Sequence, residues 1–166
     1  PPARRRRIFA AAGAVVVAVA VIVVVVLVTR SDPSAAAITI EAEDAGGDVG
    51  VEAIHAGHSG AAYRGPWIVS GDSVDFTVEM PNAGDVALTF RYSAGAGDAA
   101  RELRIDGTTA DADVVFPSTG ADAWDTWADA TVRAHLAAGT HVVSLVATDT
   151  AGNYLNLDRL RITAAG

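Results

Sequence analysis

The sequence predicts an all-β domain, built as a sandwich of antiparallel strands and preceded by one transmembrane helix. From residue 37 onward, apolar and polar residues alternate with a period of two in several short segments. Glycine-rich breaks separate these segments. Such alternation is typical of antiparallel strands that bury one face, and many short strands with regular turns favour a β-sandwich. Before this region, residues 8–28 carry no charge and are nearly all aliphatic.

The apolar run at residues 8–28 is expected to cross a membrane. As a helix it would span about 32 Å, close to the roughly 30 Å thickness of the hydrocarbon core of a bilayer. Four arginines at positions 4–7 precede the run and only Arg30 follows it directly. Because positive flanks stay in the cytoplasm, this asymmetry places the β domain outside the cell.

A secretory signal peptide is the alternative, since the small residues at 35–37 would suit a signal peptidase. We favour the uncleaved anchor because the apolar core of a signal peptide is usually about 7–15 residues long. The expected organisation is a basic cytoplasmic flank at 1–7, a membrane helix at 8–28, a linker at 29–36 and the β-sandwich at 37–166. The chain begins at Pro1 instead of Met, so a cytoplasmic part, such as a kinase, could lie upstream.

Charge and composition limit the partners of the β domain. Beyond Arg30, seven arginines against twenty acidic residues give a net charge of −13. An acidic surface repels the phosphate backbone, so we expect no nucleic-acid partner. The chain has no cysteine, which excludes a disulfide framework. We expect a monomeric domain outside the cell.

The alternation and the turn residues together define the bounds of the predicted strands. The predicted strands are 38–43, 73–80, 86–92, 102–105, 128–136, 141–147 and 155–162. Breaks at 81–84, 95–97, 106–107, 137–139 and 151–152 separate them. No amphipathic helix of useful length and no internal repeat interrupts this pattern.

Three carboxylates are candidates for a metal site. Glu41 and Glu43 are two residues apart on the first predicted strand, so their side chains share one face. The first and last strands of a sandwich are often neighbours, which would bring Asp158 to the same place. Three adjacent carboxylates repel one another unless a cation neutralises them, and Ca²⁺ prefers oxygen ligands of this kind. The alternative is a pair of exposed charges on a sheet surface.

Tryptophans in polar loops are candidates for ligand contact. The segment 116–127 holds Trp124 and Trp127 among loop-forming residues, and Trp67 lies at a junction between a loop and a strand. We expect Trp124 to be exposed, whereas Trp127 opens an apolar-alternating strand and is expected in the core. An exposed indole offers a flat apolar face that suits a sugar ring.

Signatures of catalysis do not appear in the sequence. It has no Gly-x-Ser-x-Gly elbow, no histidine pair at helical metal-ligand spacing and no phosphate-binding glycine loop. A domain of about 130 residues is also short for a glycosidase sandwich with its own cleft. We therefore expect a binding module and not an enzyme.

An ordered set of motifs resembles carbohydrate-binding modules of families 6 and 35, over residues 37–163. The motifs are IEAED at 40–44, GD at 71–72, VDFTV at 74–78, LTFRY at 88–92, FPSTG at 116–120, WDTW at 124–127, LAAG at 136–139 and NLD at 156–158. The resemblance implies a jelly-roll β-sandwich of two antiparallel sheets without catalytic activity. It also implies a structural Ca²⁺ held by Glu41, Glu43 and Asp158.

The resemblance further implies that the domain binds an oligosaccharide or polysaccharide in a cleft at the loop end of the sandwich. Trp67 and Trp124 would flank the sugar ring, and Asn156 would hydrogen-bond its hydroxyls. The chain departs from the family pattern at His58 and Ser73, close to the expected cleft. Arg64 would either pair with an acidic sugar or be a plain surface charge. The alternative function is that of a sensor or adhesion ectodomain that contacts protein instead of sugar.

Overall fold

A computed structural model describes residues 37–149 and 154–166 of the chain. The predicted membrane helix at 8–28 and both of its flanks lie outside the described residues. Within the described part, no helix combines the length and the apolar character needed to cross a bilayer.

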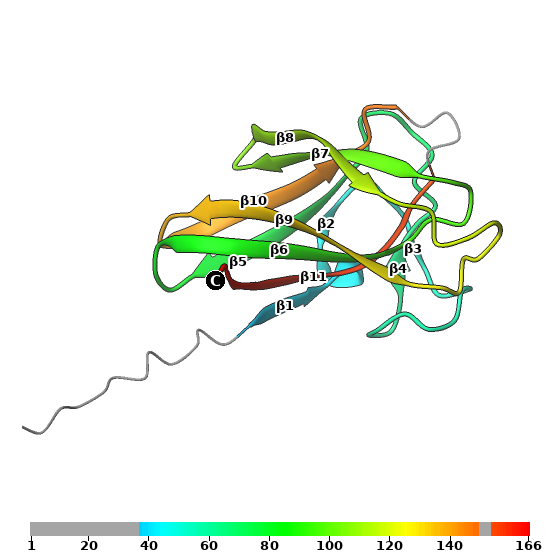
Figure 1. Cartoon of the computed structure of the whole chain (residues 1–166), viewed down its shortest axis with the longest axis horizontal. Helices are drawn as coiled ribbons and strands as arrows, with labels where there is room; N and C mark the ends of the chain where they lie inside the picture. Colours follow the sequence, from blue (N-terminus) through cyan, green and yellow to red (C-terminus); the bar gives the residue numbers. More distant parts are fainter. Residues whose placement is uncertain (1–36, 150–153) are drawn as a thin grey trace, which may run out of the picture. The chain divides into compact units, whose positions relative to one another are not determined.

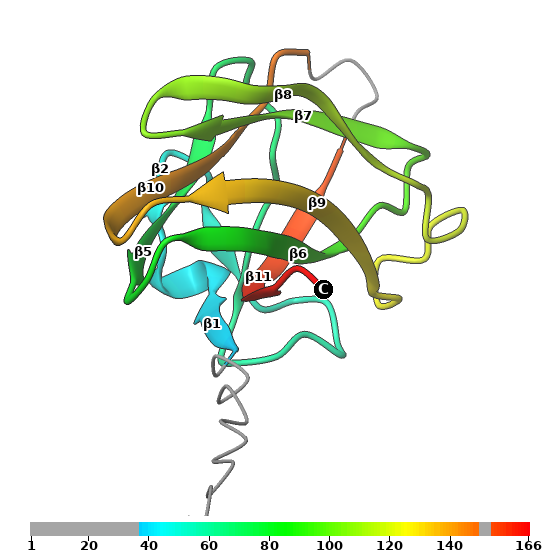
Figure 2. The ribbon, with the colours of Figure 1, turned by 60° about the vertical axis from the view of Figure 1, so that its left-hand side comes forward.

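The domain is a sandwich of two antiparallel sheets, as the alternation predicts (Figure 1). One sheet has the order β3-β4-β11-β6-β9, with β1 also paired to β11, and the other has the order β2-β5-β10-β7-β8. Figure 2 shows the two layers from a second direction. The bounds of the strands are β1 Ile38–Glu41, β2 Gly46–Gly47, β3 Val51–Glu52, β4 Tyr63–Arg64, β5 Ser73–Met80, β6 Gly84–Ser93, β7 Ala99–Ile105, β8 Thr108–Phe116, β9 Ala128–Leu136, β10 Gly139–Val146 and β11 Asn156–Ala164.

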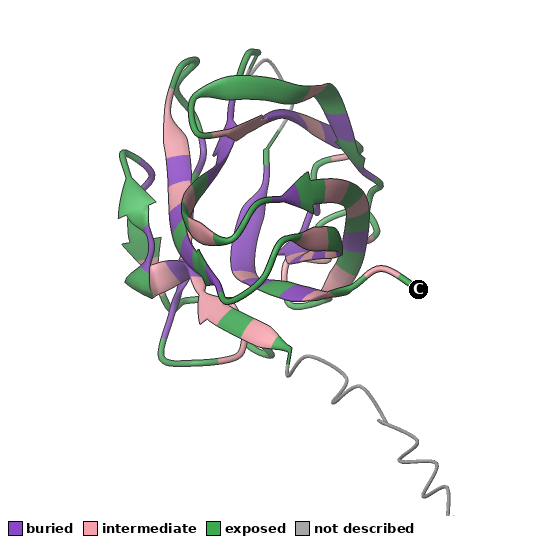
Figure 3. Cartoon of the chain, turned by 90° about the vertical axis from the view of Figure 1, so that its left-hand side faces the viewer, coloured by how far each residue is buried: buried purple, intermediate pink, exposed green. Residues whose placement is uncertain are grey.

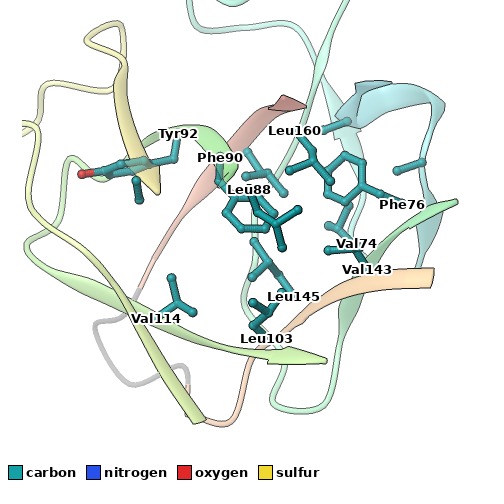
Figure 4. Packing of buried hydrophobic residues seen from close by; sticks show 14 of the residues in the cluster. Val74, Phe76, Leu88, Phe90, Tyr92, Leu103, Val114, Val143, Leu145 and Leu160 are labelled. Atoms are coloured by element: carbon teal, nitrogen blue, oxygen red, sulfur yellow. The ribbon is translucent and has the colours of Figure 1, made fainter. Parts of the chain in front are cut away.

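The core lies between the two sheets and is filled by the inward-facing residues of each strand. Buried and exposed residues alternate along the strands in Figure 3. Phe76 of β5 and Phe116 of β8 both pack on Phe90 of β6, with ring centroids 6.4 and 6.3 Å apart, respectively. Figure 4 shows Phe76 and Phe90 with aliphatic side chains around them. Each such side chain contributes about 1.5–3 kcal/mol when fully buried, so the alternation itself stabilises the sandwich.

The first predicted strand is shorter than expected. The expectation that strand geometry places Glu41 and Glu43 on one face is wrong, because β1 ends at Glu41 and a 3₁₀ turn, η1 Ala42–Asp44, follows. The turn buries Ala42 completely. The chain therefore bends where the alternating pattern continues, and Glu43 is positioned by this turn.

Strand β8 was not predicted, and the reason is its position at the edge of its sheet. Only Val114 and Phe116 of this strand are buried, so most of it carries no apolar alternation. The two-residue strands β2, β3 and β4 are also too short to leave a periodic signal.

Strand β11 has a break that positions the functional residues. Along one edge it pairs with β6, and the register shifts between Leu157 and Arg159, so Asp158 is a bulge residue. Along the other edge, Leu157 pairs with Arg64 of β4 and Arg159 pairs with Glu41 of β1. Asp158 thus lies at the gap between β1 and β4, where it can receive donors from a loop.

Candidate functional site

An open cavity of about 390 Å³ lies among the loops at one end of the sandwich. The segments that form it, around residues 52–55, 66–68, 124 and 154–156, gather at the end opposite the β5–β6 and β9–β10 turns (Figure 1). The lining residues are Glu52, Ile54, His55, Pro66, Trp67, Ile68, Trp124, Tyr154, Leu155 and Asn156. Three of the four residues predicted to bind sugar therefore meet at one cavity.

Trp124 presents a half-buried ring to the cavity and is held on several sides. His55 stacks on it, with centroids 6.0 Å apart and planes inclined by 30°. The Asp125 carboxylate lies 3.3 Å from His55 Nδ1 and accepts the Ala56 N–H at 2.9 Å, which fixes the histidine. A Cβ at Gly95 would come within 2.7 Å of the indole, so only glycine leaves room for the ring there.

Trp67 lies beneath the cavity and has no exposed surface. Its indole Nε1 donates to the Asp72 carbonyl at 3.1 Å, and the Arg101 guanidinium lies 4.4 Å from the centre of its ring. Burial lowers the pKa of Arg101 to about 10. Trp67 thus lies in the cavity lining with a fully buried side chain, whereas the resemblance implied that it would flank the sugar ring.

Asn156, the first residue of β11, is buried at the base of the cavity. A Cβ at Gly65 would come within 2.4 Å of Asn156 Oδ1, so the glycine permits the amide to occupy this position. Asn156 shares the lining of this cavity with Trp124 and Trp67.

Arg64 does not line the cavity. Its guanidinium donates to the carbonyls of Ala42 at 3.0 Å and Val49 at 2.6 Å, and also to that of Ala45. These three bonds tie β4 to η1 and to the segment after it. In this structure the side chain is therefore directed to backbone acceptors and not to the predicted sugar site.

The three predicted metal ligands surround one loop, and we call Glu41, Glu43 and Asp158 the carboxylate cluster. Ser59 Oγ lies 2.7 Å from Glu41 Oε2 and 2.8 Å from Asp158 Oδ2, and the Ser59 N–H donates to Asp158 Oδ1 at 2.8 Å. Arg91 forms an ion pair with Asp158, whose side chain is fully buried. Ser59 therefore bridges Glu41 and Asp158, and Arg91 pairs with Asp158.

Glu43 completes the cluster from η1. Its Oε1 accepts the N–H groups of Ala61 at 2.7 Å and Ala62 at 3.1 Å. Its Oε2 is buried and has no hydrogen-bond partner. Among residues 37–149 and 154–166, no set of three or more histidine, cysteine or carboxylate residues is arranged as a metal site. The structure brings the three predicted residues together without forming a finished coordination shell.

Trp127 is not in the core, contrary to the expectation from its strand. It is half-buried and belongs to a peripheral aromatic group, in which the Tyr63 ring lies 5.5 Å and the Arg91 guanidinium 5.3 Å from it. Its Nε1 donates to the Ala56 carbonyl at 2.8 Å. Trp127 directly precedes β9 and lies outside the space between the two sheets, which explains why it is not part of the core.

Sequence reasoning missed several residues of both sites. Glu52, Ile54, Ile68 and Tyr154 line the cavity, and Ser59 and Arg91 contact the carboxylate cluster. Tyr154 directly precedes the Leu-Asn-Leu-Asp motif and could have been found there. The others come from short loops or from the polar face of a strand, where no pattern marks them.

Comparison with known proteins shows the family to which the chain belongs. Residues 41–164 match the family model described as carbohydrate binding module (family 6). A cycloisomaltooligosaccharide glucanotransferase of Niallia circulans is 37% identical over 106 residues, which are 64% of this chain and 11% of that enzyme. An exo-β-D-glucosaminidase of Amycolatopsis orientalis is 36% identical over 134 residues, which are 80% of this chain and 12% of that enzyme. The chain therefore matches only a small part of each enzyme.

The fold has a match among isolated modules as well. A family 35 carbohydrate-binding module from Clostridium thermocellum superposes with a TM-score of 0.72 and 30% identity, covering 79% of this chain and 100% of that one. The structural match and the sequence match agree. The chain belongs to the family 6 carbohydrate-binding modules and shares the fold of the family 35 modules.

Proposed function

We propose that the domain binds a carbohydrate in the loop-end cavity and does not transform it. The observation that carries this proposal is the convergence of Trp124 and Asn156 on an open cavity of about 390 Å³. Ligand pockets commonly measure about 300–1,000 Å³. The apolar face of a pyranose packs on an indole, while an amide offers both a donor and an acceptor to its hydroxyls.

Binding is preferred to catalysis because the described lining of the cavity does not contain a pair of carboxylates. Glycosidases generally use a pair of Asp or Glu residues on either side of the scissile bond. Within the described residues, the lining holds a single carboxylate, Glu52. The carboxylate cluster is separate from this lining and is engaged by Ser59, Ala61 and Arg91.

We also propose that the carboxylate cluster holds a structural Ca²⁺. Three carboxylates and the single guanidinium of Arg91 leave a formal charge of −2 at this place. The buried Glu43 Oε2 has no partner, and a carboxylate oxygen of this kind suits a hard cation. Bound there, the ion would neutralise the cluster and join β1, η1 and β11 to the loop at 59–62.

The calcium proposal is tested by melting the protein with Ca²⁺ and with a chelator. An ion that binds only the folded state at 100 times its dissociation constant adds about 2.7 kcal/mol, so chelation should lower the melting temperature. Glu43→Gln should remove this response, since it keeps the oxygen that accepts from Ala61 but loses the charge. Asp44→Asn, at an exposed position of η1, is the matched control. A melting temperature unaffected by chelation would contradict a structural ion.

We propose that the domain is displayed outside the cell by residues 8–28, as the length of the run and its arginine flank suggest. This proposal rests on the sequence alone. The full chain should remain with membranes after a high-salt wash and be released by detergent. A mature N-terminus at residue 38 would instead indicate cleavage after the alanines.

A protein partner is the second candidate, favoured by the apolar rim of the cavity. Ile54 is 77% exposed and Ile68 is 56% exposed, beside Tyr154. Large exposed apolar groups next to a cavity are common at protein interaction sites. Aliphatic side chains offer a sugar no hydrogen bonds. The exposed Ile54 and Ile68 are therefore the feature that favours a protein partner over a sugar.

Binding to a panel of immobilised oligosaccharides, with and without chelator, tests the main proposal. We expect binding to at least one glycan, with competition by the same glycan in solution. Loss of that binding in Asn156→Ala, with the melting temperature retained, would assign it to the cavity. No binding across neutral, amino and acidic glycans would favour the protein partner.

A further inference from the structure

We infer that the cavity discriminates against acidic sugars and that Glu52 determines this preference. The inference rests on the proposed carbohydrate function and concerns the charge of the ligand. Within the described lining, Glu52 is the only side chain that carries a full charge at neutral pH, and it is negative. A sugar carboxylate entering the cavity would meet a like charge without a compensating cation.

Glu52 is held toward the cavity by the short sheet in which it lies. It is half-buried on β3 and pairs in register with Tyr63 of β4. The Tyr63 hydroxyl donates to Glu52 Oε2 over 3.4 Å. Burial, and after it the Glu52 charge, raises the pKa of Tyr63, as expected for a nearby ionised carboxylate. The Tyr63 hydrogen bond leaves acceptor capacity on Glu52 for a donor on a ligand.

Arginines that could neutralise a uronic acid are directed elsewhere. The guanidinium of Arg64 donates to three backbone carbonyls. Arg91 pairs with Asp158 and donates to the Gly57 carbonyl. Arg101 lies against Trp67 but has no exposed surface, so no ligand atom can contact it. The side chain that the sequence offered as a partner for an acidic sugar, Arg64, is thus committed to the fold.

His55 and Tyr154 are the remaining titratable groups of the described lining, and the Asp125 carboxylate lies beside His55. Because the Asp125 carboxylate lies 3.3 Å from His55 Nδ1, the pair adds no net positive charge that would attract an anion. The cavity therefore accepts ligands that donate hydrogen bonds, either hydroxyls or the ammonium of an amino sugar. Glucose and glucosamine units meet this requirement without carrying an anion, whereas the carboxylate of glucuronic acid would meet the like charge of Glu52.

The test is calorimetric titration of the protein with β-1,4-linked trisaccharides of glucose, glucosamine and glucuronic acid. We expect the glucuronic acid trimer to bind at least about fivefold more weakly than the better of the other two, the ratio for like charges about 4 Å apart in water. Glu52→Gln should bring this ratio close to one, because glutamine keeps the acceptor for Tyr63 and loses the charge. Glu79→Gln, exposed near the far end of β5, should leave the ratio unchanged.

A second measurement needs no variant. Raising the salt concentration screens charges, so it should improve binding of the glucuronic acid trimer relative to the glucose trimer. Equal or tighter binding of the glucuronic acid trimer at low salt would overturn the inference while leaving carbohydrate binding intact. An unchanged ratio in a folded Glu52→Gln protein would also overturn it. If none of the trimers nor any panel glycan binds, the proposed function fails, and this inference fails with it.

Discussion

Asp158 is predicted to be the residue on which the junction between β1, β4 and β11 depends most. Asp158→Ala removes the acceptor of the Ser59 N–H and one of the two partners of both Ser59 Oγ and the Arg91 guanidinium. Removing one member of a buried ion pair typically costs about 3–5 kcal/mol. Arg91 is 22% exposed and keeps its bond to Gly57, which places the expected loss near the lower limit, about 3 kcal/mol.

The assay is urea denaturation in the presence of a chelator, so that a bound cation does not contribute. Ser59→Ala, which keeps its N–H, should lose only about 1 kcal/mol. A double-mutant cycle of Asp158→Ala with Arg91→Ala should give a coupling energy of at least about 1 kcal/mol, since the two side chains are in contact. A loss below about 1 kcal/mol for Asp158→Ala, or additive effects in the cycle, would refute the argument.

Two further predictions concern the opposite end of the domain and the seat of Trp124. The Asp106 carboxylate, 2.7 Å from His141 Nδ1, raises the pKa of the histidine, and His141 lowers the pKa of Asp106. The stabilisation by this pair is complete only between about pH 4 and 6.5, the ordinary pKa values of the two groups. It is lost as the pH rises through the folded pKa of His141 or falls through that of Asp106. The melting temperature of wild type minus that of His141→Gln should therefore be larger at pH 5.5 than at pH 8.5, and an equal difference at both would count against the pair. Gly95→Ala should move the Trp124 ring, because the added Cβ would lie 2.7 Å from it, and should weaken glycan binding at least about tenfold. Gly84→Ala, at the start of β6, is the control, because a Cβ there meets nothing within 4 Å and the backbone has no positive φ. Intact binding in Gly95→Ala would show that the Trp124 ring does not depend on the space above Gly95.

The two sheets were predictable because their long strands bury one face and expose the other. Segments such as 73–80 and 128–136 were predicted with the bounds that the structure shows. The strand after Ile38 was predicted too long, because the alternating pattern passes without a break from β1 into η1. Edge strand β8 escaped prediction because water covers most of its residues.

The residues around the cavity were predictable only where a motif marks them. Trp124 and Asn156 belong to such motifs, and both line the cavity. Burial of Trp67 and the commitment of Arg64 to backbone carbonyls depend on tertiary contacts with Arg101 and η1, which no local pattern encodes. The same is true of Glu52, whose role follows from the pairing of β3 with β4.

The most direct test of the account is a titration of Trp124→Ala with the glycan that binds the wild-type protein best. The account predicts that affinity falls by at least about 2 kcal/mol, roughly 30-fold, while the melting temperature stays near that of the wild type. Trp127→Phe keeps an aromatic ring three residues away, outside the cavity lining, and should bind within about threefold of wild type. Wild-type affinity in a folded Trp124→Ala protein would contradict the assignment of the cavity as the carbohydrate site.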